Sequence, residues 1–341
     1  MPQRLHIAAL QPPLRWRQPM PNMITLRKMA EELPSGVDVV VLPEMWTGMT
    51  DDHDVAVQAG QAAQFLQTLA KACGVIVVGG SFQRPAASGR PHTGVFHTGA
   101  FHTGVLHNVC LIVDRRGEIV GEYVKGTLFS HERDTHEPGS EPGVFEVDGF
   151  RIGVQICADL WWPERTRQLI DRVDVLCVPA KTAVPSDNHV VYARTLWHAL
   201  ELTRAAESGL PVIVSDWAAG RHMPTDVDMS TGGVHARGTN FDRGILYQRH
   251  RDHTASPTAS GPNAPTATAH TSATPALGAG VHFTAGVASI CNPAHRPDME
   301  KLQRTLPRGE AGYLCEQIDL DAVAAFRDYR RRVGLLPDQA D

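Results

Sequence analysis

The sequence predicts a layered α/β fold, because short apolar runs typical of strands alternate with stretches of helical periodicity. The alternation occurs twice, with a strand-like run, a helical stretch and a second strand-like run at residues 37–43, 58–73 and 75–82, and again at 173–180, 188–208 and 211–217. Strands that alternate with helices in this way are typical of sheets covered by helices. Residues 5–13 (LHIAALQPP) predict a further buried strand at the start of the chain.

Length and charge place limits on the class of protein. The chain has 341 residues, a net charge of -5 and a pI near 6.4. This length allows a sizeable buried core, and we expect one domain spanning 1–341. The charge gives no reason to expect nucleic acid or an anionic membrane as a partner. With no apolar run long enough to span a bilayer and no signal-like start, we expect a cytosolic protein.

The most informative segment is GVQICADLWWPE at 153–164, which predicts a strand followed by a turn and a helix start at Pro163 and Glu164. This arrangement delivers Cys157 to the carboxyl end of a strand, where active sites of α/β proteins gather. A buried core thiol is the alternative on this segment alone. The six cysteines show no C-x-x-C spacing and predict free thiols of which one is functional.

Two other segments supply what a thiol nucleophile lacks. The run 37–48 (VDVVVLPEMWTG) ends a strand at Glu44, and 118–140 delivers Lys125 and then Glu132. A free thiol is mostly protonated at neutral pH, so it needs a base such as Glu44. A fixed ammonium at Lys125, with the backbone N–H of Ala158, would stabilise an oxyanion, and Glu132 would hold the lysine. These parts indicate acyl transfer through a thiol.

At these residues the chain resembles the nitrilase superfamily of carbon-nitrogen hydrolases. The resemblance rests on LPE ending at Glu44, YVKGTLF with Lys125, ICADLWWPE with Cys157, HERDTHEPG with Glu132, TRAAES at 203–208, SICNP at 289–293 and EQIDLDAV at 316–323. It implies a four-layer α-β-β-α sandwich and a Glu-Lys-Cys triad with a second glutamate. It also implies a homo-oligomer paired through a helix face, and no metal or organic cofactor.

The residues after the nucleophile narrow the expected reaction. True nitrilases of the family tend to carry Trp-Glu there, whereas this chain has Ala158-Asp159, closer to the amidase and carbamoylase branches. We therefore expect hydrolysis of a small linear amide or N-carbamoyl (ureido) compound through a thioester. Leu160 and Trp161 stand where some carbamoylases have arginines, so these positions give an anionic substrate no help. A nitrile-processing enzyme, an amide-forming acyltransferase and a non-catalytic metal-binding protein remain alternatives.

Four further residues are candidates for the substrate pocket because they follow strand ends: Trp46, Trp161, Asp216 and Trp217. For the tryptophans, ordinary core packing is an equal alternative. A carboxylate at Asp216 would favour a cationic or amine-bearing substrate. Arg204 and Glu207, three apart in a helical stretch, predict a structural ion pair.

Two segments depart from the family pattern and predict loop insertions at 91–107 and 249–280. The first repeats an HTG unit and spaces His92, His97, His102 and His107 five residues apart, a period that aligns side chains on neither a helix nor a strand. We expect no metal site there, although imidazoles suit zinc, nickel or copper. The second is rich in Thr, Ala, Pro, Ser and Gly and predicts disorder inside the domain.

Overall fold

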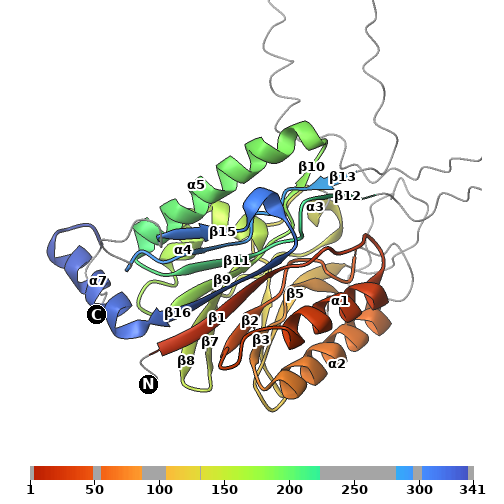
Figure 1. The fold of residues 1–341 in the computed structure, drawn as a ribbon, viewed down its shortest axis with the longest axis horizontal. Coiled ribbons are helices and arrows are strands. Elements are labelled where there is room, and N and C mark those ends of the chain that lie inside the picture. Colours follow the sequence, from red (N-terminus) through yellow and green to blue (C-terminus); the bar gives the residue numbers. More distant parts are fainter. Residues whose placement is uncertain are drawn as a thin grey trace, which may run out of the picture.

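Two β-sheets packed face to face form the centre of the fold in the computed structural model, which describes residues 4–48, 55–86, 105–130, 132–222, 282–294 and 302–336 (Figure 1). The first sheet has the order β16-β1-β2-β3-β5-β4, with β6 also paired to β5. Its strands are β1 (Arg4–Gln11), β2 (Val39–Val41), β3 (Ile76–Val78), β4 (Phe82–Pro85), β5 (Leu106–Val113), β6 (Ile119–Val124) and β16 (Gly312–Asp319). β1, β2 and β3 run parallel, while β16 and β5 join them antiparallel.

The second sheet has the order β15-β14-β11-β9-β8-β7. Its strands are β7 (Gly143–Val147), β8 (Phe150–Val154), β9 (Val175–Pro179), β11 (Val212–Ser215), β14 (Ser289–Cys291) and β15 (Gln303–Thr305). β8, β9 and β11 are parallel, so their carboxyl ends meet at one edge. A small third sheet joins β10 (Ala183–Val184), β13 (His282–Thr284) and β12 (Gly220–His222).

Helices cover the outer faces of both central sheets (Figure 1). The first sheet is covered by α1 (Pro19–Glu31) and α2 (Val55–Cys73), and the second by α5 (Val190–Ser208) with the short α4 (Pro163–Arg167) beside it. The remaining helical segments are α3 (Glu132–Thr135), α7 (Leu320–Arg332) and the 3-10 turns η1 (Cys157–Trp161), η2 (Asp187–His189) and η4 (Pro307–Gly309). This arrangement is the predicted four-layer α-β-β-α sandwich.

Alternating side chains explain why the layers stack in this way. In β1, Ile7 and Ala9 point into the core between the sheets, whereas Ala8 and Leu10 pack under α1 and α2. Because both faces of the strand are buried, its sequence is almost continuously apolar, and the same holds for β2 and β3. The runs that predicted strands are therefore those whose two faces are both covered.

Most predicted elements are present with shifted bounds. The helical stretch at 188–208 begins as the 3-10 turn η2 and becomes regular only at Val190, and the stretch at 58–73 begins earlier, at Val55. The predicted insertion at 91–107 was too long at its end. Its last two residues belong to β5, where His107 pairs with Arg84. Residues 87–104 and all of 249–280 lie outside the described residues.

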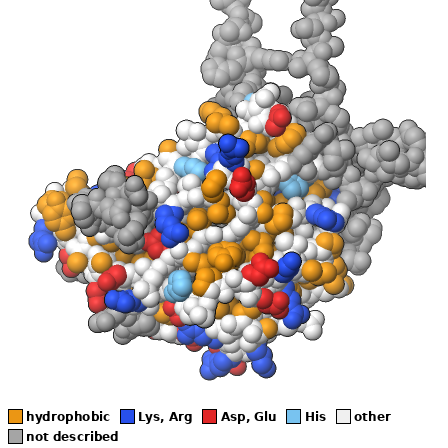
Figure 2. All heavy atoms as spheres, viewed as in Figure 1, with side chains coloured by type: hydrophobic (Ala, Val, Ile, Leu, Met, Phe, Trp, Pro, Cys, Tyr) orange, Lys and Arg blue, Asp and Glu red, His pale blue; other side chains and the backbone are white. Residues whose placement is uncertain are grey.

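The surface carries mixed charge. Acidic and basic side chains are interspersed among apolar ones on the face shown in Figure 2. Among the described residues, every helix is too short or too polar to cross a bilayer. All six cysteines are described, and their thiols are free, as the sequence predicts.

Candidate active site

Three strand ends deliver the predicted catalytic residues to one place. Glu44 lies just beyond β2, Lys125 is the first residue after β6, and Cys157 opens η1 shortly after β8. The first two strands belong to the first sheet and β8 belongs to the second, so the site lies between the sheets. All three residues are buried, with exposed fractions of 4%, 1% and 8%.

Lys125 lies between two carboxylates. Its Nζ donates to Glu44 Oε1 at 2.7 Å and to Glu132 Oε2 at 2.8 Å. Glu132 is the first residue of α3 and also accepts from the Phe129 backbone N–H at 2.8 Å. A buried ion triplet of this kind fixes its members, because each charge depends on the others for compensation.

Asn108 is a site residue that the sequence analysis missed. It is fully buried in β5, and its Nδ2 donates to Glu44 Oε1 at 3.0 Å and to Glu132 Oε1 at 2.7 Å. The amide therefore joins the two carboxylates as a second shared donor, on the same Glu44 oxygen as Lys125 and on the other Glu132 oxygen. A polar residue directly before the apolar run VCLIV of a buried strand was the available signal, since buried amides need partners.

Asn108→Leu is expected to lower the free energy of unfolding by about 3 kcal/mol, since a hydrogen bond to a charged group contributes about 1.5–3 kcal/mol. Urea unfolding followed by circular dichroism measures this change. Asn188→Leu, at an exposed position of η2, is the matched control and should change stability by less than about 0.5 kcal/mol. Equal midpoints for Asn108→Leu and the unmodified protein would contradict the role of Asn108.

The protonation states follow from burial and from the lysine. Burial raises the pKa of Glu44, and the nearby Glu132 charge adds to this, while Lys125 opposes it. Burial would also raise the pKa of Glu132, but Lys125 and His136 outweigh it and bring that pKa down to about 2. Burial lowers the proton affinity of Lys125, yet Glu132 and Glu44 raise its pKa well above its usual range. The lowered pKa favours an ionised Glu132 beside Lys125, and the raised pKa makes Glu44 the carboxylate better suited to accept a proton.

Cys157 is held in a strained turn. Its φ is 46°, a left-handed conformation that costs a non-glycine residue on the order of 1–3 kcal/mol. Burial and the Glu44 charge raise the pKa of the Cys157 thiol, which favours its protonated form. The thiol is also within hydrogen-bonding reach of the Glu44 carboxylate. The Lys181 backbone N–H also bonds the sulfur. The thiol and its base are therefore in position together.

Asp159 joins the nucleophile turn to the lysine strand. Its carboxylate accepts from the backbone N–H of Ile156 at 3.0 Å and of Thr127 at 2.6 Å, and from Tyr123 Oη at 2.8 Å. From α5, the Arg204 side chain donates to the carbonyls of Leu160 and Trp161.

The predicted ion pair between Arg204 and Glu207 is confirmed, at 2.8 Å. Asp159, read as a branch marker in the sequence, is also the residue that holds η1 against the segment after β6.

Glu44 is also held by its backbone. Its N–H donates to the Ala180 carbonyl of the second sheet at 3.0 Å, and its carbonyl accepts from Trp217 Nε1 at 2.7 Å. Trp217, a predicted pocket residue, therefore lies beside Glu44, the predicted base. Both contacts cross from one sheet to the other.

The other pocket candidates occupy different environments. Trp46 is fully buried on the helix side of the first sheet, where its Nε1 donates to Gly79 and its ring packs against Phe65 and Phe82. This core packing accounts for Trp46 without a substrate. Trp161 is 40% exposed and stacks edge-on against Trp197 at the surface.

Backbone N–H groups surround the carboxylate of Asp216. Its fully buried carboxylate accepts from the backbone N–H groups of Thr182, Trp217 and Val287 at 2.8–3.0 Å. These contacts bind together the segments after β9 and β11 and the one before β14. They account for a carboxylate at this position without a substrate amine.

Lys181 is a second site residue that the sequence analysis missed. It follows β9, is 9% exposed, and places its Nζ 3.6 Å from the ring centroid of Trp16 and 5.1 Å from that of Trp217. A lysine closing an apolar strand, in VPAK, is the same signal that identified Lys125. The site therefore contains two buried lysines.

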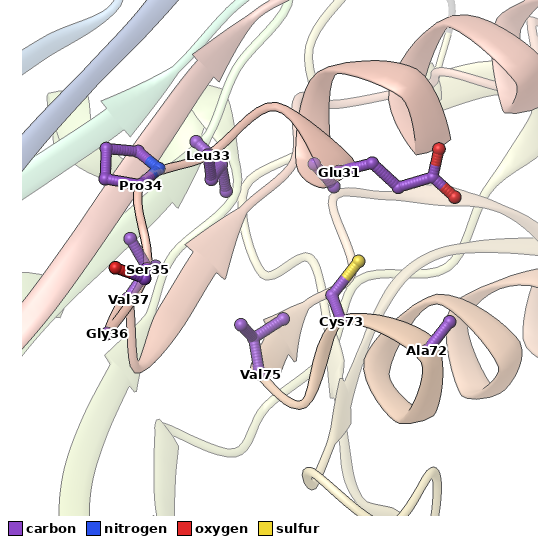
Figure 3. Close-up of a pocket in the computed structure, with 10 residues that line it drawn as sticks. Glu31, Leu33, Pro34, Ser35, Gly36, Val37, Ala72, Cys73 and Val75 are labelled. Carbon is purple, nitrogen blue, oxygen red and sulfur yellow. The ribbon is translucent and has the colours of Figure 1, made fainter.

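One cavity, of about 250 Å³, lies away from these residues (Figure 3). It is lined by Glu31 and Leu33 at the end of α1 and by Cys73 and Val75 at the end of α2. These helix ends lead into the amino ends of β2 and β3, whereas Glu44 lies beyond the carboxyl end of β2. The cavity is thus at the opposite edge of the sheet from the predicted catalytic residues.

Within the described residues, no group of three or more His, Cys, Asp or Glu side chains is arranged to hold a metal ion. Of the repeated histidines, His107 is described, and its ring lies 3.9 Å from Glu137. His92, His97 and His102 lie outside the described residues.

Known proteins are similar to this chain in sequence and in fold. A family model described as carbon-nitrogen hydrolase matches residues 6–238. The chain is 30% identical to the 2-oxoglutaramate amidase of Bacillus subtilis (strain 168) over 210 residues, which cover 59% of this chain and 72% of that protein. It is 29% identical to a deaminated glutathione amidase of Synechocystis sp. (strain PCC 6803 / GT-S) over 217 residues, which cover 57% of this chain and 72% of that protein.

Among solved structures, Saccharomyces cerevisiae Nit3, a member of branch 10 of the nitrilase superfamily, matches with a TM-score of 0.63 at 17% identity. The match covers 99% of this chain and 96% of that one. At this identity the likeness shows the fold, which is the sandwich described above.

Proposed function

Because the chain belongs to the carbon-nitrogen hydrolase family, we propose that it is an amidase that hydrolyses a small linear amide through a thioester at Cys157. The observation that carries the proposal is the Lys125 ammonium fixed between Glu44 and Glu132, with the Cys157 thiol within reach of Glu44. The amidase names of the two relatives described above support the amide as the substrate class.

In the first half-reaction, Glu44 takes the thiol proton as the sulfur attacks the carbonyl carbon. The raised pKa of Glu44 suits this transfer, since burial increases its proton affinity. Negative charge then develops on the carbonyl oxygen, where the Lys125 ammonium and the Ala158 backbone N–H stabilise it. Glu44 returns the proton to the nitrogen, the C–N bond breaks, and ammonia or an amine leaves a thioester on Cys157.

In the second half-reaction, water attacks the thioester. Glu44, again ionised, takes a proton from the water as the C–O bond forms. The tetrahedral intermediate collapses, the C–S bond breaks, and the proton on Glu44 returns to the sulfur. The products are a carboxylic acid and the free thiol, and Glu132 keeps Lys125 charged throughout.

We also propose that the chain forms a homo-oligomer, as the family resemblance implies. Exposed apolar side chains support this proposal: Trp162 is 55% exposed, and Val191 and Tyr192 at the start of α5 are 73% and 59% exposed. Large apolar side chains left in water at neighbouring elements are typical of contact surfaces.

Glu44→Gln is expected to lower the rate of ammonia release on the order of 10²–10⁴-fold, because an amide side chain accepts no proton from the thiol or from water. Intact-protein mass spectrometry of this variant, incubated with amides, carbamoyl amines and nitriles, should detect an acyl adduct whose mass identifies the substrate class. Glu164→Gln, an exposed carboxylate on the neighbouring α4, is the control and should keep the normal rate. Normal turnover by Glu44→Gln would sink the proposed chemistry.

A further inference from the structure

The guanidinium of Arg165 packs on the backbone of Gly126, the residue that follows Lys125. A methyl group placed on Gly126 would lie 2.0 Å from Arg165 Nη1, 2.3 Å from Cζ and 2.5 Å from Nη2. The φ of Gly126 lies outside the left-handed region, so its backbone conformation does not call for glycine. The close approach of the guanidinium is therefore what excludes a side chain at this position.

Arg165 is also bonded to the segment that follows Gly126. From α4, its Nε donates to Thr127 Oγ1 at 2.8 Å and lies 3.5 Å from Asp159 Oδ1. The Thr127 backbone N–H donates to the same Asp159 oxygen at 2.6 Å. Arg165, Thr127 and Asp159 thus close a ring of contacts, which we call the arginine triangle. Its cation faces a carboxylate whose side chain is fully buried, so the arginine charge offsets part of the cost of that burial.

The arginine triangle joins the two halves of the proposed active site. Thr127 lies on the segment that leaves β6 of the first sheet, directly after Lys125 and Gly126. Asp159 lies in η1, the turn that Cys157 opens after β8 of the second sheet. The triangle therefore fixes the segment that carries the lysine relative to the turn that carries the thiol.

The proposed reaction depends on this alignment. Lys125 stabilises a negative charge that develops on the carbonyl oxygen only as the Cys157 sulfur attacks. A misplacement of about 1 Å at a reacting group costs up to about 10²-fold in rate. Arg165 contacts the backbone directly after Lys125, so its effect on the rate passes through the placement of the ammonium.

We propose that Arg165 is a positioning residue of the active site: its guanidinium, packed on Gly126 and bonded to Thr127, holds the Lys125 ammonium in register with the Cys157 turn. This inference rests on the proposed amidase function and adds to it a residue that acts through the backbone. Arg165 comes from α4, which supplies no group to the proposed reaction, so its contribution is to geometry alone.

The first test is Arg165→Ala, with ammonia release from butyramide as the assay and circular dichroism as the measure of folded protein. We expect kcat per folded molecule to fall about 10–100-fold. KM should stay nearly unchanged, because the lost alignment acts only in the transition state. Arg172→Ala, at an exposed arginine beyond α4, is the control and should keep both values. A merely structural role would lower the folded fraction and leave kcat per folded molecule normal, which would overturn the inference.

The second test is Gly126→Ala, which removes no charge and no hydrogen-bonding group. Because the end of an arginine side chain is flexible, the added methyl should displace the guanidinium of Arg165 and spare the backbone. We expect kcat to fall toward that of Arg165→Ala while the protein remains folded. Gly60→Ala, in α2 with open space beside its Cα, is the matched control and should keep the normal kcat. Normal kcat in Gly126→Ala would contradict the proposed role.

The double variant Gly126→Ala/Arg165→Ala tests whether both changes act by the same route. Without the guanidinium, the methyl at position 126 meets no group of Arg165, so it should add no further loss. We expect the kcat of the double variant to equal that of Arg165→Ala within about twofold. Losses that multiply would show that the two residues act independently and would overturn the inference.

A measurement without turnover separates this inference from the proposed function. Burial and Glu44 raise the pKa of the Cys157 thiol, while Lys125 opposes them. A displaced Lys125 should raise this pKa further and slow alkylation of Cys157 by iodoacetamide at neutral pH, about tenfold for each unit of pKa, because the thiolate is the nucleophile. Peptide mass spectrometry follows the modification of Cys157, with the half-buried Cys73 of the same protein as the reference.

The two proposals fail on different results of these measurements. If the unmodified protein releases ammonia from no amide, the proposed function fails. The inference then stands if Cys157 is alkylated more slowly in Arg165→Ala and in Gly126→Ala than in the unmodified protein, while Cys73 reacts at the same rate in all three. It fails if Cys157 reacts at one rate in all three proteins.

Discussion

Cys157→Ala is expected to reduce kcat/KM for amide hydrolysis on the order of 10⁴-fold or more, because members of a nucleophile–base unit act together and the loss of one removes the covalent route. The fold should persist, since alanine fits wherever cysteine does. Ammonia release under saturating amide, combined with intact mass analysis for a missing acyl adduct, measures the effect. The φ of 46° at this position remains in the variant, so the turn itself is unchanged.

The matched control is Cys177→Ala. Cys177 lies in β9, is fully buried and has a free thiol, but it packs in the core between the sheets and away from Glu44. Its replacement should lower thermal stability and leave activity per folded molecule near normal. If Cys157→Ala retained more activity than Cys177→Ala, Cys157 would not be the nucleophile.

Lys125→Met is expected to abolish measurable turnover and to lower the free energy of unfolding by about 3–5 kcal/mol at pH 7, the usual cost of removing one partner of a buried ion pair. The variant leaves Glu44 and Glu132 facing each other with Asn108 as the remaining shared donor. Turnover fails because the oxyanion loses its cation. Lys28→Met, with an exposed side chain, should change neither quantity appreciably.

The stability of the unmodified protein and that of Lys125→Met should change in opposite directions as the pH falls. In the unmodified protein the pKa of Glu132 is about 2, below its ordinary value of 4.5, so this group stabilises the fold above pH 4.5 and that stability is lost as pH falls toward 2. In Lys125→Met, burial and mutual repulsion raise the carboxyl pKa values above the unfolded ones. Protonation then favours the folded state, and the stability deficit should shrink between pH 7 and pH 5. A deficit that stays constant in urea unfolding would show that the triplet is not the cause.

The positions of the three proposed catalytic residues were predictable because each follows a strand that is itself predictable. Glu44, Lys125 and Cys157 stand directly after apolar runs, and those runs are strands buried on both faces. Glu132 was predicted through its motif, and its bond to Lys125 agrees with its proposed role as the counter-ion. The four-layer sandwich followed from the family resemblance, since alternation alone indicates layers without their number.

Contacts between distant segments were not predictable. Asn108 precedes the apolar run VCLIV, which marks it as a polar residue of a buried strand, but the local sequence does not indicate that two carboxylates from other elements face it. The position of Lys181 depends on its contacts with Trp16, which follows β1, and Trp217, which follows β11. Both residues are distant from Lys181 in the sequence. For Trp46 the sequence left substrate contact and core packing open, because a tryptophan after a strand end can turn toward either face, and here it packs on the helix side of the first sheet.

Under the proposed mechanism, the division of the site between the two sheets makes the packing of the core between them a determinant of the reaction rate. Glu44 and Lys125 follow strands of the first sheet, and Cys157 follows a strand of the second. The contacts of Glu44 with Ala180 and Trp217 cross between the sheets and hold Glu44 in place relative to the second sheet. The distance between sulfur and base is therefore a dimension of the whole sandwich, governed by methyl groups such as those of Ile7 and Val175. Substitutions in this core, although they are far from the substrate, would therefore change the rate by shifting Cys157 relative to Glu44 and Lys125.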